Sequence, residues 1–535
     1  MEVVLFVFLM LGVCKLKLIK NMKFLLAIIL SLLTIVFIIN LNKNESASTI
    51  LETLSISSKG NGAEEPFNIS IMLNYHTADA SNDRIKQLIE EATNTKLDIH
   101  FIPDANYNSR LNTAYATDTL PMVVPMNFQM FNQYKGAIRD GQFWEIGPYL
   151  NEFDNLRKLK QEIVGNTKVD GRIYSLYQGR PLSRQGIIYR KDWADNLGLS
   201  APTTTDEFFE MARAFTEDDP NRSGKEDTIG LAERSDLVYG AIKTISSWFG
   251  VPNEFGLKEG QVLPQFMFSE YMDTLYFMRE MYSKGYMNQN FPITSKNDQM
   301  GLFINGIAGI YIGSMLDVNK LYNDTSAKNP EVVLDVHNYV RGPHGEFGIW
   351  SIPGFSNVIL FPKSAIKTEE ELKKVLAFYD QLMSPEISNI FLWGIEGEHY
   401  EVVDGMAKII DRNLHDKEVR PYLALEVGEP ETNGGYDRYY GYDIQVKAID
   451  LSLQNEKYLI HNPTITLDSE SFILDGGPLY EMMEDATFQF ILGLIDEEGF
   501  QKAINEWLNK GGEAIIEEYT NSYMNQDKYN PIKKG

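Results

Sequence analysis

The sequence predicts an α/β protein of two lobes, in which mostly parallel sheets are flanked by helices and a cleft separates the lobes. Apolar runs of strand length alternate along the chain with amphipathic helical patterns, which is typical of parallel sheets covered by helices. The chain also has 535 residues, and this length suits two lobes better than one small core.

The N-terminal region, residues 1–45, predicts an export signal or a membrane anchor. Phe24 to Leu41 is an apolar run of 18 residues that follows several lysines, and a bilayer span needs about 20 apolar residues. Because such a basic flank stays in the cytoplasm, the rest of the chain is expected on the extracellular face of the cytoplasmic membrane. Residues 46–65 predict a polar tether. Cleavage or retention of the apolar run stays open, as does a translation start at Met22.

The body begins with a strand, a helix and a second strand, predicted over Phe67 to Tyr75, Asp83 to Thr93 and Lys96 to Phe101. Another apolar strand is predicted over Leu120 to Met126. Ligands of such sheets lie beyond the carboxyl ends of the strands. Tyr75, at the end of the first strand, is therefore a candidate for ligand contact, and a role as a cap on the core is the alternative.

A helix is predicted just before the most distinctive loop of the chain. Thr204 and Glu207 have the spacing of a capping box, and Phe208, Met211 and Phe215 then follow at helical spacing. The strand Thr228 to Leu231 is expected after the loop. A second amphipathic helix is predicted over Glu369 to Met383, and two closing helices are predicted over Pro478 to Gly493 and Asp496 to Leu508.

The loop between that helix and strand predicts a calcium site. Oxygen-bearing side chains occupy its positions 1, 3, 5 and 9, a backbone carbonyl serves position 7, and Gly224 at position 6 permits a sharp turn. The ligands would be Asp219, Asn221, Ser223, the carbonyl of Lys225 and Asp227. Gly230 stands at position 12, where a calcium hand has a bidentate glutamate. A polar turn without an ion is the alternative.

Two separated stretches of the sequence resemble one known family. The first contains Tyr189-Arg190-Lys191-Asp192-Trp193, Leu197-Gly198-Leu199 and the loop just described, and the second is Trp393-Gly394-Ile395-Glu396-Gly397-Glu398-His399-Tyr400. Together they resemble the extracellular solute-binding proteins, family 1 type, of bacterial ABC importers, and within them the saccharide-associated lipoproteins with a calcium loop.

The resemblance implies a type II periplasmic-binding-protein-like fold and a function. It implies one lobe from residues 66–182 and 357–460, and another from residues 183–356 and 461–535. An oligosaccharide, with uronic-acid-containing glycans included, would be captured by lobe closure and delivered to ABC permease subunits by a monomeric protein. The calcium ion would be structural.

The resemblance also suggests ligand-binding residues. Asn127 follows the strand whose matching loop faces the ligand, and Arg180 lies on the first crossing between lobes, where a salt bridge is the alternative. Tyr311 lies on the segment that delivers a stacking aromatic residue in the family, although Met315 holds the position expected for Trp. Glu396 belongs to the second matching stretch, and orientation of a turn is its alternative.

Two tryptophans complete the candidate ligand site. Trp248 ends a predicted helix where an aromatic side chain can overhang a cleft, and Trp350 precedes the return crossing at Asn357 to Leu360. Trp507 has the spacing of a core residue on a closing helix.

Composition and motifs narrow the function classes. A net charge of −25 excludes the basic stripe of a nucleic-acid-binding surface, and the single cysteine, Cys14, leaves the body without a disulfide. We find no nucleophile elbow, P-loop or zinc-protease motif. A polysaccharide-degrading enzyme stays an alternative because two suitably placed carboxylates suffice for glycoside hydrolysis, and a receptor coupled to a membrane sensor is another.

Overall fold

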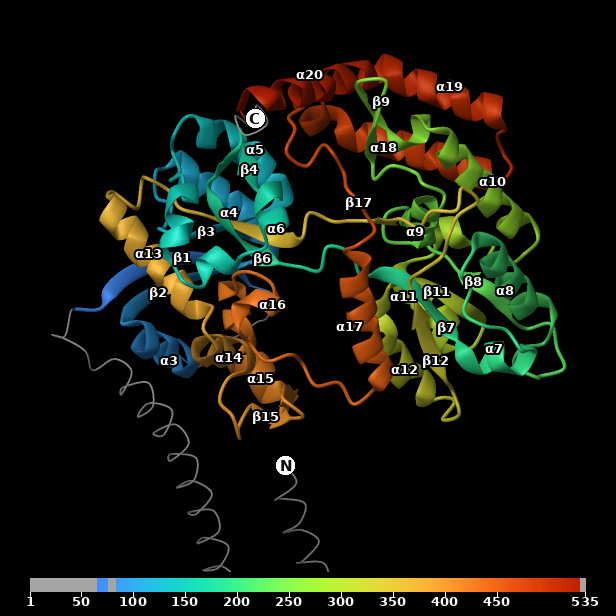
Figure 1. The fold of residues 1–535 in the computed structure, drawn as a ribbon, viewed down its shortest axis with the longest axis horizontal. Helices are drawn as coiled ribbons and strands as arrows, with labels where there is room; N and C mark the ends of the chain where they lie inside the picture. The colour runs from blue at the N-terminus through green and yellow to red at the C-terminus, as the bar shows by residue number, and fades with distance from the viewer. Residues whose placement is uncertain (1–64, 76–82, 530–535) are drawn as a thin grey trace, which may run out of the picture.

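The computed structural model describes residues 65–75 and 83–529, and these residues form two lobes (Figure 1). The predicted export segment, residues 1–45, and the tether up to residue 64 lie outside the described residues. Within the part of the chain that the structure describes, no helix is both long and apolar enough to cross a membrane.

The first lobe contains a parallel pair of strands, β2-β1, and a three-stranded sheet, β3-β14-β6, which a β-bridge between Ile71 and Val123 joins into one mixed arrangement. Its strands are β1 (Phe67–Tyr75), β2 (Thr95–Pro103), β3 (Val124–Asn127), β14 (Phe355–Leu360) and β6 (Ser175–Gly179). β1 runs parallel to β2. The Met72 N–H donates to the Val123 carbonyl at 3.2 Å and the Val123 N–H donates to the Ser70 carbonyl at 3.1 Å, which joins β1 to the residue before β3. β14 is antiparallel to both β3 and β6 because it returns from the other lobe.

The second lobe contains a four-stranded sheet with the order β12-β7-β11-β8. Its strands are β7 (Gln185–Arg190), β8 (Ile229–Ala232), β11 (Ala308–Ser314) and β12 (Leu334–His337). β7 is antiparallel to β11 and β12, whereas β11 and β8 are parallel. The sheets are therefore mixed, which corrects the expectation of mostly parallel sheets, because the strands next to the crossings enter from the opposite direction.

Helices surround both sheets. Those of the first lobe are α3 (Arg84–Thr93), α4 (Asp104–Ala116), α5 (Phe128–Arg139), α6 (Gln161–Asn166), α13 (Glu369–Leu382), α14 (Pro385–Trp393), α15 (Arg412–Glu418) and α16 (Pro430–Asn433). Those on the side of the second lobe are α7 (Lys191–Leu197), α8 (Thr205–Glu217), α9 (Ala241–Trp248), α10 (Ser269–Ser283), α11 (Lys296–Ile304), α12 (Val318–Ser326), α17 (Asp443–Asn455), α18 (Glu470–Ile491), α19 (Glu497–Trp507) and α20 (Glu513–Tyr529).

Short strands complete the architecture. They form pairs in the described residues: β4 (Lys168–Val169) with β5 (Arg172–Ile173), β9 (Phe255–Lys258) with β10 (Gln261–Pro264), β13 (Ile349–Trp350) with β17 (Leu459–Ile460), and β15 (Tyr400–Val403) with β16 (Met406–Ile409).

Separate apolar cores support the two lobes. One core draws on residues 69–182 and 355–427, and the largest core of the second lobe draws on residues 187–340 and 467–519. A smaller core beneath β12 includes Ala448 of α17 and the half-buried Tyr442 and Leu451. Helix α17 therefore packs on the second lobe, which corrects its predicted assignment to the first lobe within residues 357–460, since its apolar face covers β12 and α12.

Local signals set several helix starts. The Thr204 hydroxyl accepts a hydrogen bond from the Glu207 N–H at 3.2 Å and so caps α8, as its spacing predicts. The predicted helix start at Pro478 is wrong, because α18 begins at Glu470, where the Ser469 hydroxyl caps it. Pro478 lies inside this helix.

The crossings between the lobes lie side by side. The Arg180 N–H donates to the Gly354 carbonyl at 2.8 Å, and the Ile352 N–H donates to the Leu182 carbonyl at 2.8 Å. Residues near 180–182 and 352–354 thus form a narrow hydrogen-bonded connection next to β13 and β17, and Figure 1 shows these segments running between the lobes.

Candidate ligand-binding site between the lobes

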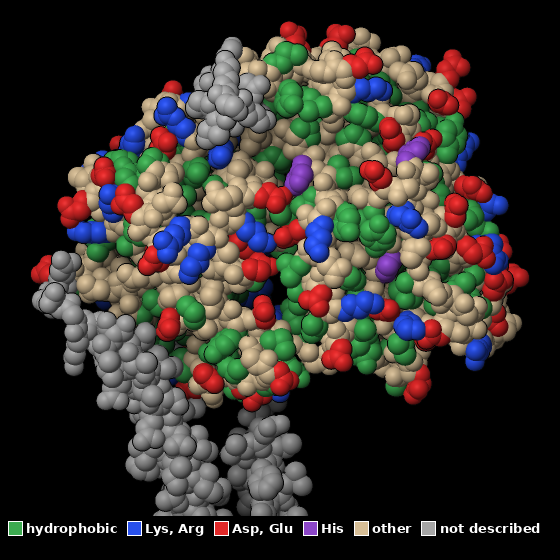
Figure 2. Space-filling view, viewed as in Figure 1, with side chains coloured by type: hydrophobic (Ala, Val, Ile, Leu, Met, Phe, Trp, Pro, Cys, Tyr) green, Lys and Arg blue, Asp and Glu red, His purple; other side chains and the backbone are tan. Residues whose placement is uncertain are grey.

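A cavity of about 360 Å³ opens at the connection between the lobes. Helix α5 of the first lobe lines it with Phe128, Asn132 and Lys135, and the second lobe contributes Tyr239, Lys243, Asn253 and Glu254. The crossing from Trp350 to Phe355 and residues 462–473 complete the wall. Figure 2 shows the surface hollowed along the line between the lobes, with Lys and Arg side chains on both sides. We call this space the polar cavity.

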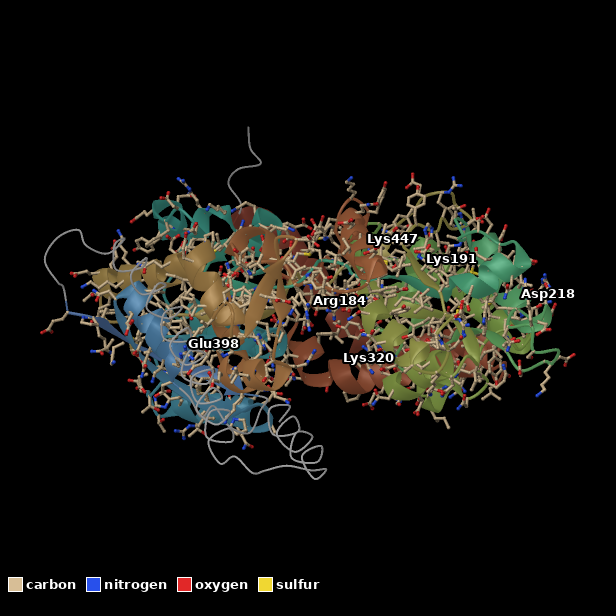
Figure 3. All side chains as sticks on the ribbon, turned by 90° about the horizontal axis from the view of Figure 1, so that it is seen from below. Arg184, Lys191, Asp218, Lys320, Glu398 and Lys447 are labelled. Carbon is tan, nitrogen blue, oxygen red and sulfur yellow. The ribbon has the colours of Figure 1, made fainter. Side chains whose placement is uncertain are left out.

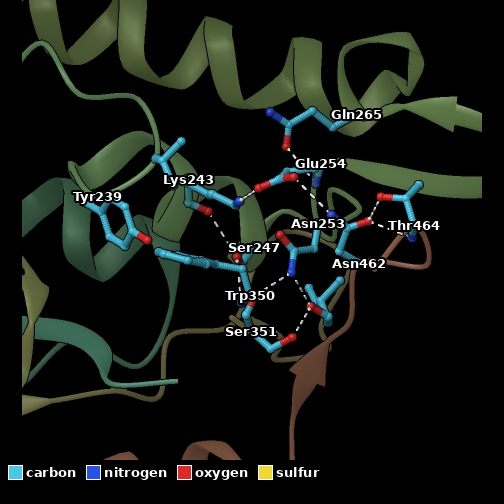
Figure 4. Close-up of polar contacts among 12 residues, drawn as sticks. Tyr239, Lys243, Ser247, Asn253, Glu254, Gln265, Trp350, Ser351, Asn462 and Thr464 are labelled. Carbon is cyan, nitrogen blue, oxygen red and sulfur yellow. Dashed lines mark hydrogen bonds and ion pairs between the residues drawn. The ribbon is translucent and has the colours of Figure 1, made fainter. Parts of the chain in front are cut away.

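Trp350 is held at the wall of the polar cavity by contacts on several sides (Figure 4). Its indole N–H donates to the Thr244 hydroxyl at 3.1 Å, and its backbone N–H donates to the Ser247 hydroxyl at 3.1 Å. The Lys243 Nζ lies 4.6 Å from the centre of its ring, and the Tyr239 ring meets it edge-on. Trp350 is 2% exposed and Tyr239 is 45% exposed, so Tyr239 offers the accessible aromatic face.

Two buried amide oxygens of the polar cavity lack a hydrogen-bond donor among the described residues. They are Oδ1 of Asn132 and Oδ1 of Asn253. The Asn253 amide nitrogen, in contrast, donates to the Ser351 and Ile460 carbonyls at 2.7 and 2.9 Å, which fixes the orientation of the side chain. Buried polar atoms are normally paired, so these two acceptors suit a ligand that carries hydroxyl donors.

A second cavity of about 380 Å³ lies at the strand ends of the first lobe. Gln178 and Asn357 line it from β6 and β14, and Arg180, Arg420 and Glu426 bring charge to it. We call this space the arginine cavity. Adjacent residues Phe355 and Ser356 of β14 line the polar cavity and the arginine cavity respectively, so both spaces border the start of this strand.

Glu426 faces Arg180 in the arginine cavity, with a distance of 3.8 Å between the carboxylate and the guanidinium. The Asn433 amide also donates to the Glu426 carboxylate at 3.0 Å. Burial raises the pKa of Glu426 to about 7, although Arg180 and the Asn433 hydrogen bond act in the opposite direction. The Arg180 side chain is 43% exposed, so its guanidinium is accessible to an anionic ligand.

Comparison with known proteins identifies the family. Residues 78–341 match the family model of the bacterial extracellular solute-binding proteins. A protein of Bacillus subtilis (strain 168), the polygalacturonan/rhamnogalacturonan-binding protein YtcQ, is 40% identical over 454 residues, which cover 84% of this chain and 89% of that protein. The chain belongs to the bacterial extracellular solute-binding proteins.

Other proteins are similar to this chain over most of its length. The lipoprotein LipO of Bacillus subtilis (strain 168) is 30% identical over 471 residues, which cover 85% of this chain and 92% of that protein. Among solved structures, an HMO-binding, ABC-transporter-associated solute-binding protein of Bifidobacterium longum infantis superposes with a TM-score of 0.67 at 15% identity, covering 87% of this chain and 99% of that one. The predicted family and the type II two-lobed fold are thereby confirmed.

The structure brings only some of the predicted ligand residues of this solute-binding protein to the cavities. Arg180 lines the arginine cavity and Trp350 lines the polar cavity. Tyr75 ends β1, but its side chain lies outside the described residues. Asn127 is exposed at the end of β3, where its side-chain oxygen accepts the Met130 N–H at 2.9 Å and caps α5.

The remaining candidates have structural contacts instead. Trp248 is 1% exposed, and its ring packs edge-on against Phe208 inside the core of the second lobe. Tyr311 is 1% exposed and donates to the Asp317 carboxylate at 2.8 Å. Glu396 is exposed on a turn that the Gly397 N–H closes onto the Tyr400 carbonyl at 2.7 Å. These positions favour core packing for the first two side chains and the turn interpretation for Glu396.

The structure adds cavity residues that the sequence interpretation missed, chiefly Tyr239, Lys243, Asn253 and Gln178. Tyr239 follows the end of β8, so the rule that ligands lie beyond strand ends could have indicated it. Lys243 lies inside the buried helix α9 and Asn253 follows it, and no local pattern separates them from surface residues.

The predicted calcium loop is folded on itself. Asp219 accepts the N–H groups of Ser223 and Gly224 at 2.8 and 3.0 Å, and Asp227 accepts the Ser223 hydroxyl and the Asn221 amide at 3.0 and 2.9 Å. The Lys225 carbonyl lies 3.5 Å from the Ser223 hydroxyl. Gly224 has a φ of 72°, which a glycine adopts at no steric cost. The hydrogen bond from Asn221 contributes most to lowering the pKa of Asp227.

The donor set of this loop fits a hard cation such as calcium, since carboxylate, amide, hydroxyl and carbonyl oxygens converge in one turn. Only two of the donors are carboxylates, and among the described residues no group of three or more His, Cys, Asp or Glu side chains could hold a metal ion. The loop is remote from the cavities: Figure 3 shows Asp218, its neighbour, at the outer end of the second lobe and Arg184 between the lobes.

Proposed function

We propose that this protein is the solute-binding component of an ABC importer and captures a uronic-acid-containing oligosaccharide between its lobes. The observation that carries the ligand class is the 40% identity to a relative named for binding polygalacturonan and rhamnogalacturonan. Closure of the lobes around the glycan would favour one conformation through contacts to both lobes, and that conformation would dock on membrane permeases.

The chemistry of the two cavities supports an anionic glycan. The chain as a whole carries a net charge of −25, yet Lys135, Lys243, Arg180 and Arg420 all line the cavities. An arginine fork pairs well with a planar carboxylate, and the unpaired oxygens of Asn132 and Asn253 suit sugar hydroxyls. The exposed face of Tyr239 suits the apolar face of a sugar ring.

A binding test separates this proposal from a neutral-sugar specificity. Trigalacturonate should bind the purified body in isothermal titration calorimetry, and maltotriose should not. Arg180→Gln should weaken trigalacturonate binding at least about tenfold, because it removes a charged hydrogen bond worth about 1.5–3 kcal/mol. Arg110→Gln is the matched control, since Arg110 is exposed on α4 and lines neither cavity. Equal affinity of both variants would refute the role of Arg180.

A binding role, rather than cleavage, is the second part of the proposal. The family match and the relatives named above are binding proteins, and this supports a chain that releases its ligand intact. Incubation with polygalacturonan should release no new reducing ends, and steady release would favour a polysaccharide-degrading enzyme. A receptor role would require ligand-dependent contact with a membrane sensor in place of permease subunits.

We further propose that the loop at residues 219–227 binds a structural calcium ion through the donors listed above, as its geometry permits. The ion would hold the connection between α8 and β8.

We also propose that the protein acts as a monomer held at the extracellular face of the cytoplasmic membrane by its N-terminal region. The lipoprotein relative and the extracellular family support this location.

A further inference from the structure

A third cavity adjoins the polar cavity inside the second lobe. Its volume is about 330 Å³, and its lining is mostly apolar. Aromatic and aliphatic side chains form the wall, among them Phe255, Phe266, Tyr271, Leu479, Met483 and Trp507. We call this space the apolar cavity.

The polar and apolar cavities share part of their lining. Val238, Lys243, Glu254 and Phe472 contact both spaces. Lys243 donates to the Glu254 carboxylate at 2.9 Å, and the Asn462 amide donates to the same carboxylate at 3.0 Å (Figure 4). The Glu254 carboxylate and its two donors therefore form a polar boundary between the two cavities. A molecule that spans this boundary would place a polar part in the polar cavity and an apolar part in the apolar cavity.

Helix α18 leaves room at the wall of the apolar cavity. Gly476 and Gly477 are consecutive and line the space, although glycine weakens a helix interior. A Cβ atom added at Gly477 would meet no heavy atom within 4 Å. On the same helix, Phe472 and Tyr480 line the cavity and are 40% and 44% exposed, so an apolar entrance faces solvent.

We propose that the apolar cavity binds an aryl group carried by the captured oligosaccharide, as an aglycone or an ester substituent. The aromatic side chains of its wall can pack edge-on or offset against a flat ring. Its volume exceeds that of engineered apolar cavities of about 150 Å³ that take up benzene. The link to an oligosaccharide rests on the proposed function, because the sugar part would occupy the polar cavity across the Lys243–Glu254 boundary.

The aryl site can be tested without any sugar. We would record ¹⁹F NMR spectra of 4-fluorobenzyl alcohol with the purified protein. The signal should show line broadening that saturates with protein concentration. Gly477→Leu should abolish the broadening by filling the cavity wall. Gly301→Leu is the matched control: Gly301 lies in helix α11, its added Cβ would meet only Asn305 at 4.0 Å, and it lines none of these cavities. Absence of broadening, or equal broadening with both variants, would overturn the aryl site.

The link to the glycan is tested with trigalacturonate and its phenyl glycoside. The phenyl glycoside should bind about tenfold more tightly, since burying the ring removes apolar surface from water. Gly477→Leu should remove this gain and leave the affinity for unsubstituted trigalacturonate unchanged. Equal affinities for the two ligands would overturn the inference while the proposed function stands. Broadening of the free alcohol without binding of either glycan would refute the proposed function and retain the aryl site.

Discussion

The cavity between the lobes draws its side chains from segments far apart in the sequence, whereas the loop at residues 219–227 draws all its oxygen donors from consecutive residues. Trp350 and Asn253 in the cavity wall are each 2% exposed. Asp219, Asn221, Ser223 and Asp227 instead lie at the surface and bond mostly to one another. The first region depends on how the lobes pack, and the second depends on local chain geometry.

Because of this difference, we expect the two regions to contribute differently to the stability of the fold. Truncation of a side chain in the cavity wall leaves a void between packed segments, and the surrounding structure closes such a void only partly. Truncation in the loop exposes a short polar turn to water, where lost hydrogen bonds are replaced by solvent. We therefore expect cavity residues to control stability directly and loop residues to do so only through a bound ion.

The largest effect is expected for Trp350→Ala. Trp350 is 2% exposed, contacts Lys243 and Tyr239, and donates to the buried Thr244 hydroxyl. Its removal should lower the free energy of unfolding by about 3–5 kcal/mol, measured by urea denaturation in the absence of calcium. Trp350→Phe should recover part of this loss, because it refills most of the volume.

Ser223→Ala, measured in the same calcium-free buffer, sets the other side of the comparison. Ser223 is exposed and its hydroxyl bonds within the loop, so the change should stay within about 0.5 kcal/mol. A loss as large as that of Trp350→Ala would mean that the loop packs as tightly as the cavity wall, and the contrast between the two regions would fail.

An intermediate effect is expected when calcium is added. Extracellular calcium sites bind with dissociation constants of about 0.1–1 mM, so 10 mM calcium should stabilise the native protein by about 1.4–2.7 kcal/mol. The double variant Asp219→Asn, Asp227→Asn should lose this response, because it removes both carboxylates among the proposed calcium ligands. Thermal melts with calcium and with magnesium are the measurement. An unchanged calcium response of the variant would refute the site.

The loop could be predicted from the sequence more fully than the cavity, because the loop depends on local geometry and the cavity on the packing of distant segments. The loop geometry, the α8 cap at Thr204 and the first strands could be predicted because their signals lie within a few residues. The ligand site could not be predicted as fully: Trp248 and Trp350 look alike in sequence, yet one packs inside the second lobe and the other lines the polar cavity. Lys243 contacts Glu254 and Trp350 only because the fold brings these segments together, and the same fold brings Asn462 to Glu254.

Two further predictions, the lobe assignment of α17 and the start of α18, were wrong for different reasons. Helix α17 covers β12 because Tyr442, Ala448 and Leu451 bury their side chains there, and no marker in the sequence separates this helix from those of the first lobe. Pro478 suggested a helix start, but the capping hydroxyl of Ser469 lies earlier and α18 continues through the proline.

A smaller effect than that of calcium is expected from pH, and its sign differs between the two regions. Burial raises the pKa of Glu426 to about 7, so between about pH 4.5 and 7 the native protein keeps a proton that the unfolded chain has released. Stability from this group is therefore full at low pH and falls as pH rises through this window. The Glu426 side chain is 19% exposed, which screens the effect to about 1 kcal/mol. Asp227 acts in the opposite direction, because its pKa is lowered by the hydrogen bond from Asn221, and its contribution is lost as pH falls.

Glu426→Gln isolates this contribution. The variant should match the native protein near pH 4.5 and become relatively more stable toward pH 8, because glutamine carries no proton to lose. Urea unfolding at several pH values is the measurement, and Glu331→Gln, at an exposed position before β12, is the control. Parallel pH profiles of native protein and Glu426→Gln would show that Arg180 and Asn433 hold the carboxylate ionised. In that case Glu426 would be ionised despite its burial, as the exposed carboxylates of the loop are. Its pairing with Arg180 would then compete with the binding of a uronate.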